Sequence, residues 1–167
     1  MANDYFQFKQ FTIRQEKCAM KVGTDGVLLG AWADVTQAQR LLDIGTGTGL
    51  IAIMAAQRNP ELIIDAIEID PAAFEQAQEN ANNTPWRERI HIFQGKVQTF
   101  APAYKYDTIV CNPPFFINST KNPAHIFIFS HSFSGTELVW PEAARKSVRR
   151  RFAKMFWIRY TKLEKNF

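Results

Sequence analysis

The segment "VCNPPFF" places an amide side chain and two prolines where an apolar run ends. Proline fixes its own φ angle and offers no N–H to a sheet, so the segment predicts a rigid corner after a strand. The side-chain oxygen of Asn112 and the carbonyl of Pro113 could accept both hydrogens of a planar exocyclic amine such as adenine N6, which would localise its lone pair. Phe115 could stack on the purine face. Because Pro113 and Pro114 hold the acceptors rigidly, we predict that this corner works by orienting an amine. The alternative is a stiffened loop with core aromatics.

The segment "LDIGTGTGL" is a second candidate for chemistry, because three glycines follow an aspartate between an apolar strand and a helix. Gly45, Gly47 and Gly49 allow the backbone to approach a ligand closely, with helix N–H groups facing it. The G-x-G-x-G spacing differs from the G-x-G-x-x-G of dinucleotide binders. Asp43 suits a cationic amino group and would repel a pyrophosphate, which argues against a nicotinamide-dependent oxidoreductase. The alternative is a turn that only packs the strand on the helix.

Glu68 ends the second predicted strand, in the segment "AIEIDP". An acidic residue at this position commonly accepts hydrogen bonds from ribose hydroxyls. Asp43 and Glu68 together therefore describe a site for a nucleoside that carries an amino acid, namely S-adenosylmethionine. The alternative for Glu68 is a solvated strand end.

The elements that must position these residues alternate between strand and helix. Strands are predicted at 40–45, 62–69, 89–93 and 106–111, and helices at 48–59 and 72–83, the second capped by Asp70 with Pro71 in its first turn. This alternation predicts an α/β fold with a parallel, doubly wound sheet and helices on both faces, whose ligands lie at the carboxyl ends of the strands. Residues 5–15 predict a short hairpin, and residues 21–33 a Gly-rich turn and a helix capped by Thr24 or Asp25.

The motifs "DIGTGTG", "IEID" and "NPPF" resemble those of the class I S-adenosylmethionine-dependent methyltransferases, which have a Rossmann-like fold. More narrowly, "FTIRQEKCAMKVGTDGVLLGAWA", "AQENANNTPWRERI" and "CNPPFF" resemble the bacterial tRNA1(Val) (adenine-37-N6)-methyltransferase family, over residues 5–122. The resemblance implies S-adenosylmethionine as cofactor, tRNA as partner, and Asn112, Pro113, Pro114 and Phe115 at the target adenine. It implies a cofactor site formed by Lys21, Thr24, Asp25, Asp43, Gly45, Thr46, Gly47, Gly49, Glu68, Ile69 and Val97.

One position departs from the family pattern. Lys96 stands where the family places an acidic residue that contacts the adenine of the cofactor. A lysine cannot accept a hydrogen bond from the adenine amine. This departure predicts either a weaker cofactor affinity or a neighbouring backbone N–H in its place.

The chain divides into a methyltransferase domain over residues 1–122 and a basic tail over residues 123–167, where the family pattern stops. The tail holds 9 Lys and Arg against 3 Asp and Glu, whereas residues 1–122 hold 11 against 13. "HIFIF" predicts one strand, and Pro141–Leu163 has helical apolar spacing that predicts a basic amphipathic helix. In one interpretation, this helix contacts tRNA or a membrane surface. In the other, the tail is a frame-shifted or truncated end, and we favour this second interpretation.

Composition bounds the remaining possibilities. A length of 167 residues with 46% hydrophobic residues indicates one folded domain. Cys18 and Cys111 match no metal or disulfide spacing, and the start of the chain does not resemble a signal peptide, which predicts a cytoplasmic protein. No apolar run approaches the ~20 residues of a membrane helix. His91, His125 and His131 are expected to be structural, no metal site is predicted, and the sequence assigns no oligomeric state.

Three functions other than tRNA adenine methylation stay open. The first is methyl transfer to guanine N2 of ribosomal RNA, and the second is methyl transfer to a glutamine amide of a protein, because N-P-P-F also occurs in such enzymes. The third possibility is a truncated protein that binds the cofactor without transferring a methyl group.

Overall fold

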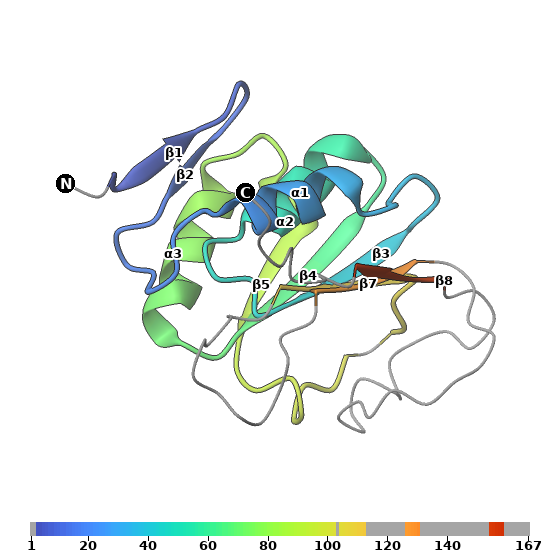
Figure 1. Cartoon of the computed structure of the whole chain (residues 1–167). Helices are drawn as coiled ribbons and strands as arrows, with labels where there is room; N and C mark the ends of the chain where they lie inside the picture. The colour runs from blue at the N-terminus through green and yellow to red at the C-terminus, as the bar shows by residue number, and fades with distance from the viewer. Residues whose placement is uncertain (1–2, 103, 113–125, 131–153, 159–167) are drawn as a thin grey trace, which may run out of the picture.

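The computed structural model describes residues 3–102, 104–112, 126–130 and 154–158 (Figure 1). In this part of the chain a six-stranded sheet has the order β5-β4-β3-β6-β7-β8, and β1 and β2 form a separate two-stranded sheet. The strands β3, β4, β5 and β6 are parallel, as the alternation of elements predicts. The strands are β1 Tyr5–Gln7, β2 Thr12–Arg14, β3 Arg40–Ile44, β4 Ile63–Glu68, β5 Ile90–Gln94, β6 Thr108–Cys111, β7 Ile126–Ser130 and β8 Lys154–Ile158.

Three α-helices accompany these strands: α1 Thr24–Trp32, α2 Leu50–Arg58 and α3 Pro71–Asn82, with a short 3₁₀ helix at Arg87–Arg89. The predicted cap of α3 is confirmed, because Asp70 Oδ1 accepts a 2.8 Å hydrogen bond from the Ala73 N–H. The predicted cap of α1 is wrong. Its N-cap is the extended Gly23, and no side chain caps the helix, since Thr24 is already the first helical residue.

The two faces of the sheet pack against different partners. Successive residues of a strand point to opposite faces, and Leu41 and Leu42 accordingly belong to different apolar clusters. The cluster around Leu41 takes in residues of all three helices. In Figure 1, α1 and α2 lie above the sheet and α3 lies to its left. The cluster around Leu42 is completed by side chains of the connection between β5 and β6, among them Phe100 and Tyr106. Within the described residues, this connection packs on the second face of the sheet.

The end of the sheet differs from the predicted helical tail. β7 confirms the strand predicted from "HIFIF" and pairs with β6 in the antiparallel sense, and β8 pairs with β7 in the same sense. The predicted helix at Pro141–Leu163 is wrong at Lys154–Ile158, which is strand β8. Phe, Trp and Ile favour strands, and backbone pairing with β7 outweighs the helical spacing of the apolar residues. The rest of the predicted helix, with His125 and His131, lies outside the described residues.

The predicted N-terminal hairpin is confirmed by the antiparallel pairing of β1 and β2. The rings of Phe8 and Phe11 stack with centroids 4.6 Å apart. Phe11 and Ile13 belong to the cluster around Leu41, so the hairpin is fixed to the domain by burial of apolar side chains.

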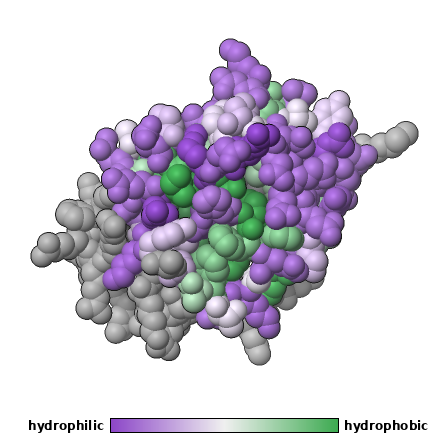
Figure 2. All heavy atoms as spheres, turned by 180° about the vertical axis from the view of Figure 1, so that it is seen from behind, coloured by the Kyte–Doolittle hydropathy of each residue, from purple (hydrophilic) through white to green (hydrophobic). Residues whose placement is uncertain are grey.

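Figure 2, the view from behind, shows apolar side chains reaching the surface among hydrophilic ones. None of the helices in the described residues has the length and apolar character that crossing a bilayer requires.

Candidate active site

Three neighbouring strands end at the same level of the sheet. Ile44 of β3 pairs in register with Ile67 of β4 on one side and with Cys111 of β6 on the other. The next residues along the chain are Gly45, Glu68 and Asn112, of which Glu68 is still the last residue of β4, and they therefore lie side by side at the carboxyl edge of the sheet. The structure thus brings together the glycine turn, the acidic strand end and the amide of the proline corner. Pro113, Pro114 and Phe115 lie outside the described residues.

The glycine turn that follows β3 leaves space beside two of its three glycines in the described part of the chain. Gly45, Gly47 and Gly49 have φ angles of 69°, 58° and 80°, which favour glycine. A Cβ at Gly45 or Gly47 would meet no atom of the described residues within 4 Å. A Cβ at Gly49 would instead lie 3.5 Å from Ala77 of α3. Among the described residues, the first half of the turn therefore has no close neighbour on its Cβ side, and the second half packs against α3.

Asp43 lies beneath this turn with a side chain that is fully buried. Its Oδ2 accepts a 2.7 Å hydrogen bond from the hydroxyl of Thr46, whereas its Oδ1 has no hydrogen-bond partner in the described part of the chain. Burial raises the pKa of Asp43 to about 7, although the hydrogen bond from Thr46 opposes the rise. A buried carboxylate oxygen without a partner is costly. Asp43 is thus prepared for a cation or a strong donor.

Glu68 is also buried, and its carboxylate binds three backbone N–H groups. Oε2 accepts from Gly47 at 2.8 Å, and Oε1 accepts from Ile69 at 2.8 Å and from Asp70 at 3.0 Å. An ionised carboxylate offers about four lone-pair sites, so about one is left for a ligand hydroxyl. The residue predicted to bind ribose therefore also shapes the glycine turn.

The first turn of α1 packs against the amide of Asn112. A Cβ at Gly26 would lie 3.6 Å from Asn112 Nδ2 and 3.4 Å from Leu50 Cδ2. Thr24 and Asp25, predicted near the cofactor, begin the same helix and so lie toward this corner. Lys21 has other partners, because its Nζ donates to the Asn3 carbonyl at 3.1 Å and lies 3.9 Å from Asp4 Oδ1.

The remaining predicted cofactor residues lie after β4 and β5. Ile69 is 60% exposed, directly after Glu68, and provides an apolar surface at this edge. Val97 is half-buried against the cluster around Leu42. Lys96 is exposed and follows Gly95, whose N–H donates to the Glu68 carbonyl at 2.8 Å.

Two buried amides of α3 were missed by the sequence reasoning. Asn80 is 1% exposed, and its Nδ2 donates to the carbonyls of Arg14 and of Thr48, both at 2.8 Å. Gln76 is fully buried, and its Oε1 accepts from the Lys17 N–H at 3.1 Å. The position of Gln76 and Asn80 in the sequence could have indicated this role. Both lie beside Ala77 on the apolar side of the helix, where a polar side chain needs a specific partner.

A second polar cluster lies within the sheet, away from the glycine turn. The hydroxyl of Tyr106 donates to Asp65 Oδ2 at 2.5 Å, and His91 Nδ1 lies 3.1 Å from Asp65 Oδ1. Each oxygen of the buried Asp65 carboxylate thus has a partner, which indicates that this cluster has a structural role. In the residues that the structure describes, no group of three or more His, Cys, Asp or Glu side chains could hold a metal ion.

The two cysteines are free thiols. Burial raises the pKa of Cys18 to about 11 and that of Cys111 to about 12, so both are protonated near neutral pH. A thiol in this state is a poor nucleophile. Neither cysteine is therefore a candidate for covalent chemistry.

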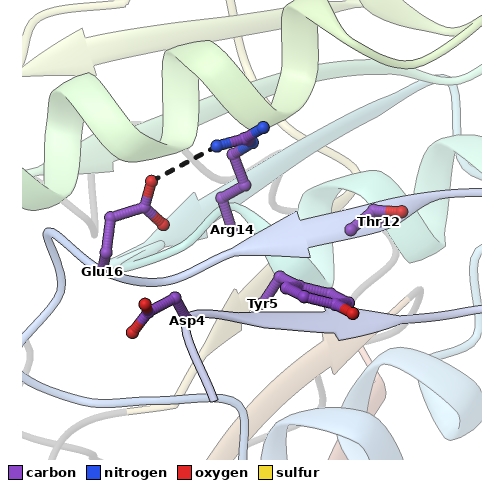
Figure 3. A pocket seen from close by; sticks show the side chains of 5 residues that line it. All are labelled: Asp4, Tyr5, Thr12, Arg14 and Glu16. Carbon is purple, nitrogen blue, oxygen red and sulfur yellow. Dashed lines mark ion pairs between the residues drawn. The ribbon is translucent and has the colours of Figure 1, made fainter. Parts of the chain in front are cut away.

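A pocket of about 390 Å³ lies on the N-terminal hairpin (Figure 3). Its walls carry both charges, with Arg14 Nη1 3.6 Å from Glu16 Oε1. None of its residues belongs to the glycine turn or to the tips of β3, β4 and β6. The lining residues are Asp4, Tyr5, Thr12, Arg14 and Glu16.

A largely parallel α/β sheet that carries a buried aspartate, a glycine turn and Asn112 of the sequence N-P-P-F at its carboxyl edge defines a methyltransferase domain. The comparison with protein families agrees, because the model of the methyltransferase small domain family matches residues 20–131. The chain belongs to this family. The match extends nine residues beyond residue 122, where the sequence resemblance was predicted to end.

Individual relatives confirm the narrower resemblance. The chain is 58% identical over 125 residues to the tRNA1(Val) (adenine(37)-N6)-methyltransferase of Parabacteroides distasonis, covering 74% of this chain and 52% of that protein. It is 56% identical over 124 residues to the protein of the same name from Bacteroides thetaiotaomicron, covering 74% and 52%. For the Histophilus somni protein of that name the identity is 57% over 150 residues, covering 84% and 61%. The chain spans about half the length of the first two relatives.

Proposed function

We propose that this protein transfers a methyl group from S-adenosylmethionine to N6 of an adenine in tRNA, with adenine 37 of valine tRNA as the specific target. The observation that carries the proposal is the position of Asp43, one residue before the end of β3, beside Asn112, which directly follows the neighbouring strand β6. Asp43 has a buried oxygen without a partner in the described residues, and Asn112 lies on the adjacent strand's end. The names of the relatives that are more than half identical support the same reaction.

The residues present fit S-adenosylmethionine. Asp43 Oδ1 suits the ammonium group of its amino acid part, and the open side of Gly45 and Gly47 leaves room for a ligand close to the backbone. The last acceptor site of Glu68 suits a ribose hydroxyl, and the exposed Ile69 offers an apolar contact for the adenine ring. When bound, the cofactor supplies an electrophilic methyl group on sulfur.

Asn112 has the role of orienting the target amine. Its side-chain oxygen accepts one amine hydrogen, and the carbonyl of Pro113 accepts the other, so that the nitrogen lone pair is localised. Phe115 stacks on the target base. Orientation of this kind supplies catalysis without a strong base, and the amine proton leaves to water or to a nearby carbonyl. The packing of α1 against the Asn112 amide supports this role, because it restricts the side chain before the substrate binds.

The direct test is nucleoside mass analysis after incubation of the protein with isotope-labelled S-adenosylmethionine. Unmodified tRNA, ribosomal RNA and total protein serve as separate acceptors. We expect label only in N6-methyladenosine from tRNA. Label in N2-methylguanosine or in methylglutamine would replace the proposed acceptor, and cofactor binding without label in any acceptor would identify a binding protein.

The cellular setting follows from the proposed substrate. Modification of tRNA supports a cytoplasmic location, and two free cysteines fit a reducing compartment. Fractionation of cells that express a tagged protein would test this, with enrichment in the soluble fraction expected. Recovery with membranes would contradict the cytoplasmic setting.

A further inference from the structure

Asn80 joins two parts of the domain that are far apart in the sequence. Its amide accepts from the Arg14 N–H at 2.9 Å and donates to the Arg14 carbonyl at 2.8 Å, which fixes strand β2 of the N-terminal hairpin. The second hydrogen of Nδ2 is donated to the Thr48 carbonyl in the glycine turn, also at 2.8 Å. With 1% exposure the side chain is shielded from water, so none of these bonds is readily replaced by solvent.

The hydrogen bond from Asn80 to the Thr48 carbonyl lies in the second half of the glycine turn, which packs against α3. Thr48 lies between Gly47, which faces open space, and Gly49, where a Cβ would meet Ala77 of α3 at 3.5 Å. On the other side, the Gly47 N–H is held by Glu68 at 2.8 Å. The turn is therefore fixed from β4 through Glu68 and from α3 through Asn80.

We propose that Asn80 is a positioning residue, which holds the glycine turn in its binding shape by tying it to α3 and to the hairpin. This inference rests on the proposed function in one respect, since it takes S-adenosylmethionine to be the ligand of the turn. Asn80 itself makes no contact with the ligand. It acts through the Thr48 carbonyl, and removing its amide leaves that carbonyl without its donor.

Gln76 provides a matched control on the same helix. It is a fully buried amide one turn before Asn80, and its Oε1 fixes the backbone N–H of Lys17, close to the end of the same hairpin. In the described residues its hydrogen bonds reach Lys17 and Glu79 but not the glycine turn. Asn80→Ala and Gln76→Ala therefore both remove a buried amide, and only the first releases the turn.

The experiment compares the two variants in thermal unfolding, in calorimetric titration with S-adenosylmethionine and in hydrogen exchange of the cofactor-free protein. We expect both to unfold at a lower temperature than the wild type. Titrated well below the unfolding temperature, Asn80→Ala should bind the cofactor on the order of tenfold more weakly, as expected for about 1.4 kcal/mol of lost positioning. Gln76→Ala should bind with an affinity close to that of the wild type.

Hydrogen exchange supplies a readout that does not depend on the ligand. In Asn80→Ala, the amides of residues 45–50 should exchange faster than in Gln76→Ala. Asn80→Ser, whose hydroxyl and a water can restore part of the bonding, should lie between Asn80→Ala and the wild type, and it replaces Asn80→Ala if that variant does not fold.

Two results would overturn the inference: an equal loss of affinity in the Asn80 and Gln76 variants, or unchanged exchange in the turn of the Asn80 variants. Failure of the wild type to bind the cofactor would instead contradict the proposed function. The exchange measurement would still decide whether Asn80 positions the turn.

Discussion

The carboxylate of Glu68 accepts a 2.8 Å hydrogen bond from the backbone N–H of Gly47. Glu68 ends β4, and Gly47 lies in the turn after β3, so this bond connects the ends of two adjacent strands. The same carboxylate binds the N–H groups of Ile69 and Asp70, directly before α3. One side chain thus fixes the entry into α3 and the shape of the glycine turn.

Glu68→Gln replaces one acceptor oxygen by an NH₂ group. At least one of the three backbone N–H groups then loses its acceptor, so the free energy of unfolding should fall by roughly 1–3 kcal/mol. Cofactor affinity should fall as well. Urea unfolding and calorimetric titration check the two effects, and Glu88→Gln is the control because Glu88 is exposed. An unfolding free energy equal to that of the control would contradict the role of Glu68 in shaping the turn.

Asp43→Asn should change how stability depends on pH. In the folded protein the pKa of Asp43 is about 7, above its ordinary value of 3.8, so folding favours the protonated form. The contribution of Asp43 to the stability of the wild type is therefore greatest below about pH 4, falls as the pH rises toward 7 and levels off above it. Asparagine does not ionise, so the stability of the variant relative to the wild type should increase across this range. Chemical unfolding measured at several pH values tests this, and a constant difference would contradict the raised pKa.

Asp43 should also make cofactor binding depend on pH. A bound ammonium group favours the ionised carboxylate. Below a pH of about 7 binding must therefore release a proton, and the affinity of the wild type should rise as the pH approaches 7. Titration calorimetry in buffers of different ionisation enthalpy counts the released proton, and Asp43→Asn is the control for protons released by the ligand. Equal proton release by both proteins would exclude Asp43 as the partner of the ammonium group.

Asn112→Ala should abolish methyl transfer and leave cofactor binding intact. The side chain is assigned to the target amine, whereas the backbone pairing of β6 with β3 does not depend on it. Single-turnover transfer to tRNA and calorimetric titration with S-adenosylmethionine measure the two properties separately. An equal loss of both would give the corner a structural role only.

Tyr106→Phe should destabilise the fold without changing the cofactor site. The variant removes the hydroxyl that donates to the buried Asp65, at a cost of roughly 2 kcal/mol. Burial and the neighbouring Asp65 both raise the pKa of Tyr106, in accordance with a hydroxyl that stays protonated as a donor. Tyr104→Phe is the control, because it keeps the ring that lies 3.6 Å below the Arg40 guanidinium. Thermal unfolding should separate the two variants, and a change in cofactor affinity for Tyr106→Phe would show that the two faces of the sheet are coupled.

The elements with local signals are those that the sequence predicts well. The Asp70-Pro71 start of α3, the strand β3 and the glycines after it depend on neighbouring residues, so their types and spacing are sufficient. Asn80 could not be assigned in this way, because its partners Arg14 and Thr48 are 66 and 32 residues away. Its role is decided by how α3 packs, and an amide in a helix is more commonly a surface residue.

The same distinction explains the segment Lys154–Ile158. Its apolar spacing fits a helix when only neighbouring residues are considered, but its backbone pairs with β7. Partners supplied by another strand outweigh the local pattern. The N-cap of α1 differs for a more local reason. Thr24 and Asp25 both have side chains that can cap a helix, but the helix already begins at Thr24, so the cap position falls on Gly23.

The strands β3, β4 and β6 are paired in register and end side by side, and this alignment determines where the domain can accept inserted residues. One extra residue within β3 would turn every following side chain to the other face, and Asp43 would exchange sides with Leu42. No rotamer change could restore the carboxylate to the glycine turn. An insertion in the surface connection between α3 and β5 would leave the ladder intact. Length variants that retain binding should therefore carry their insertions outside the strands. A domain transplanted into another protein must keep the β3-β4 and β3-β6 pairings uninterrupted.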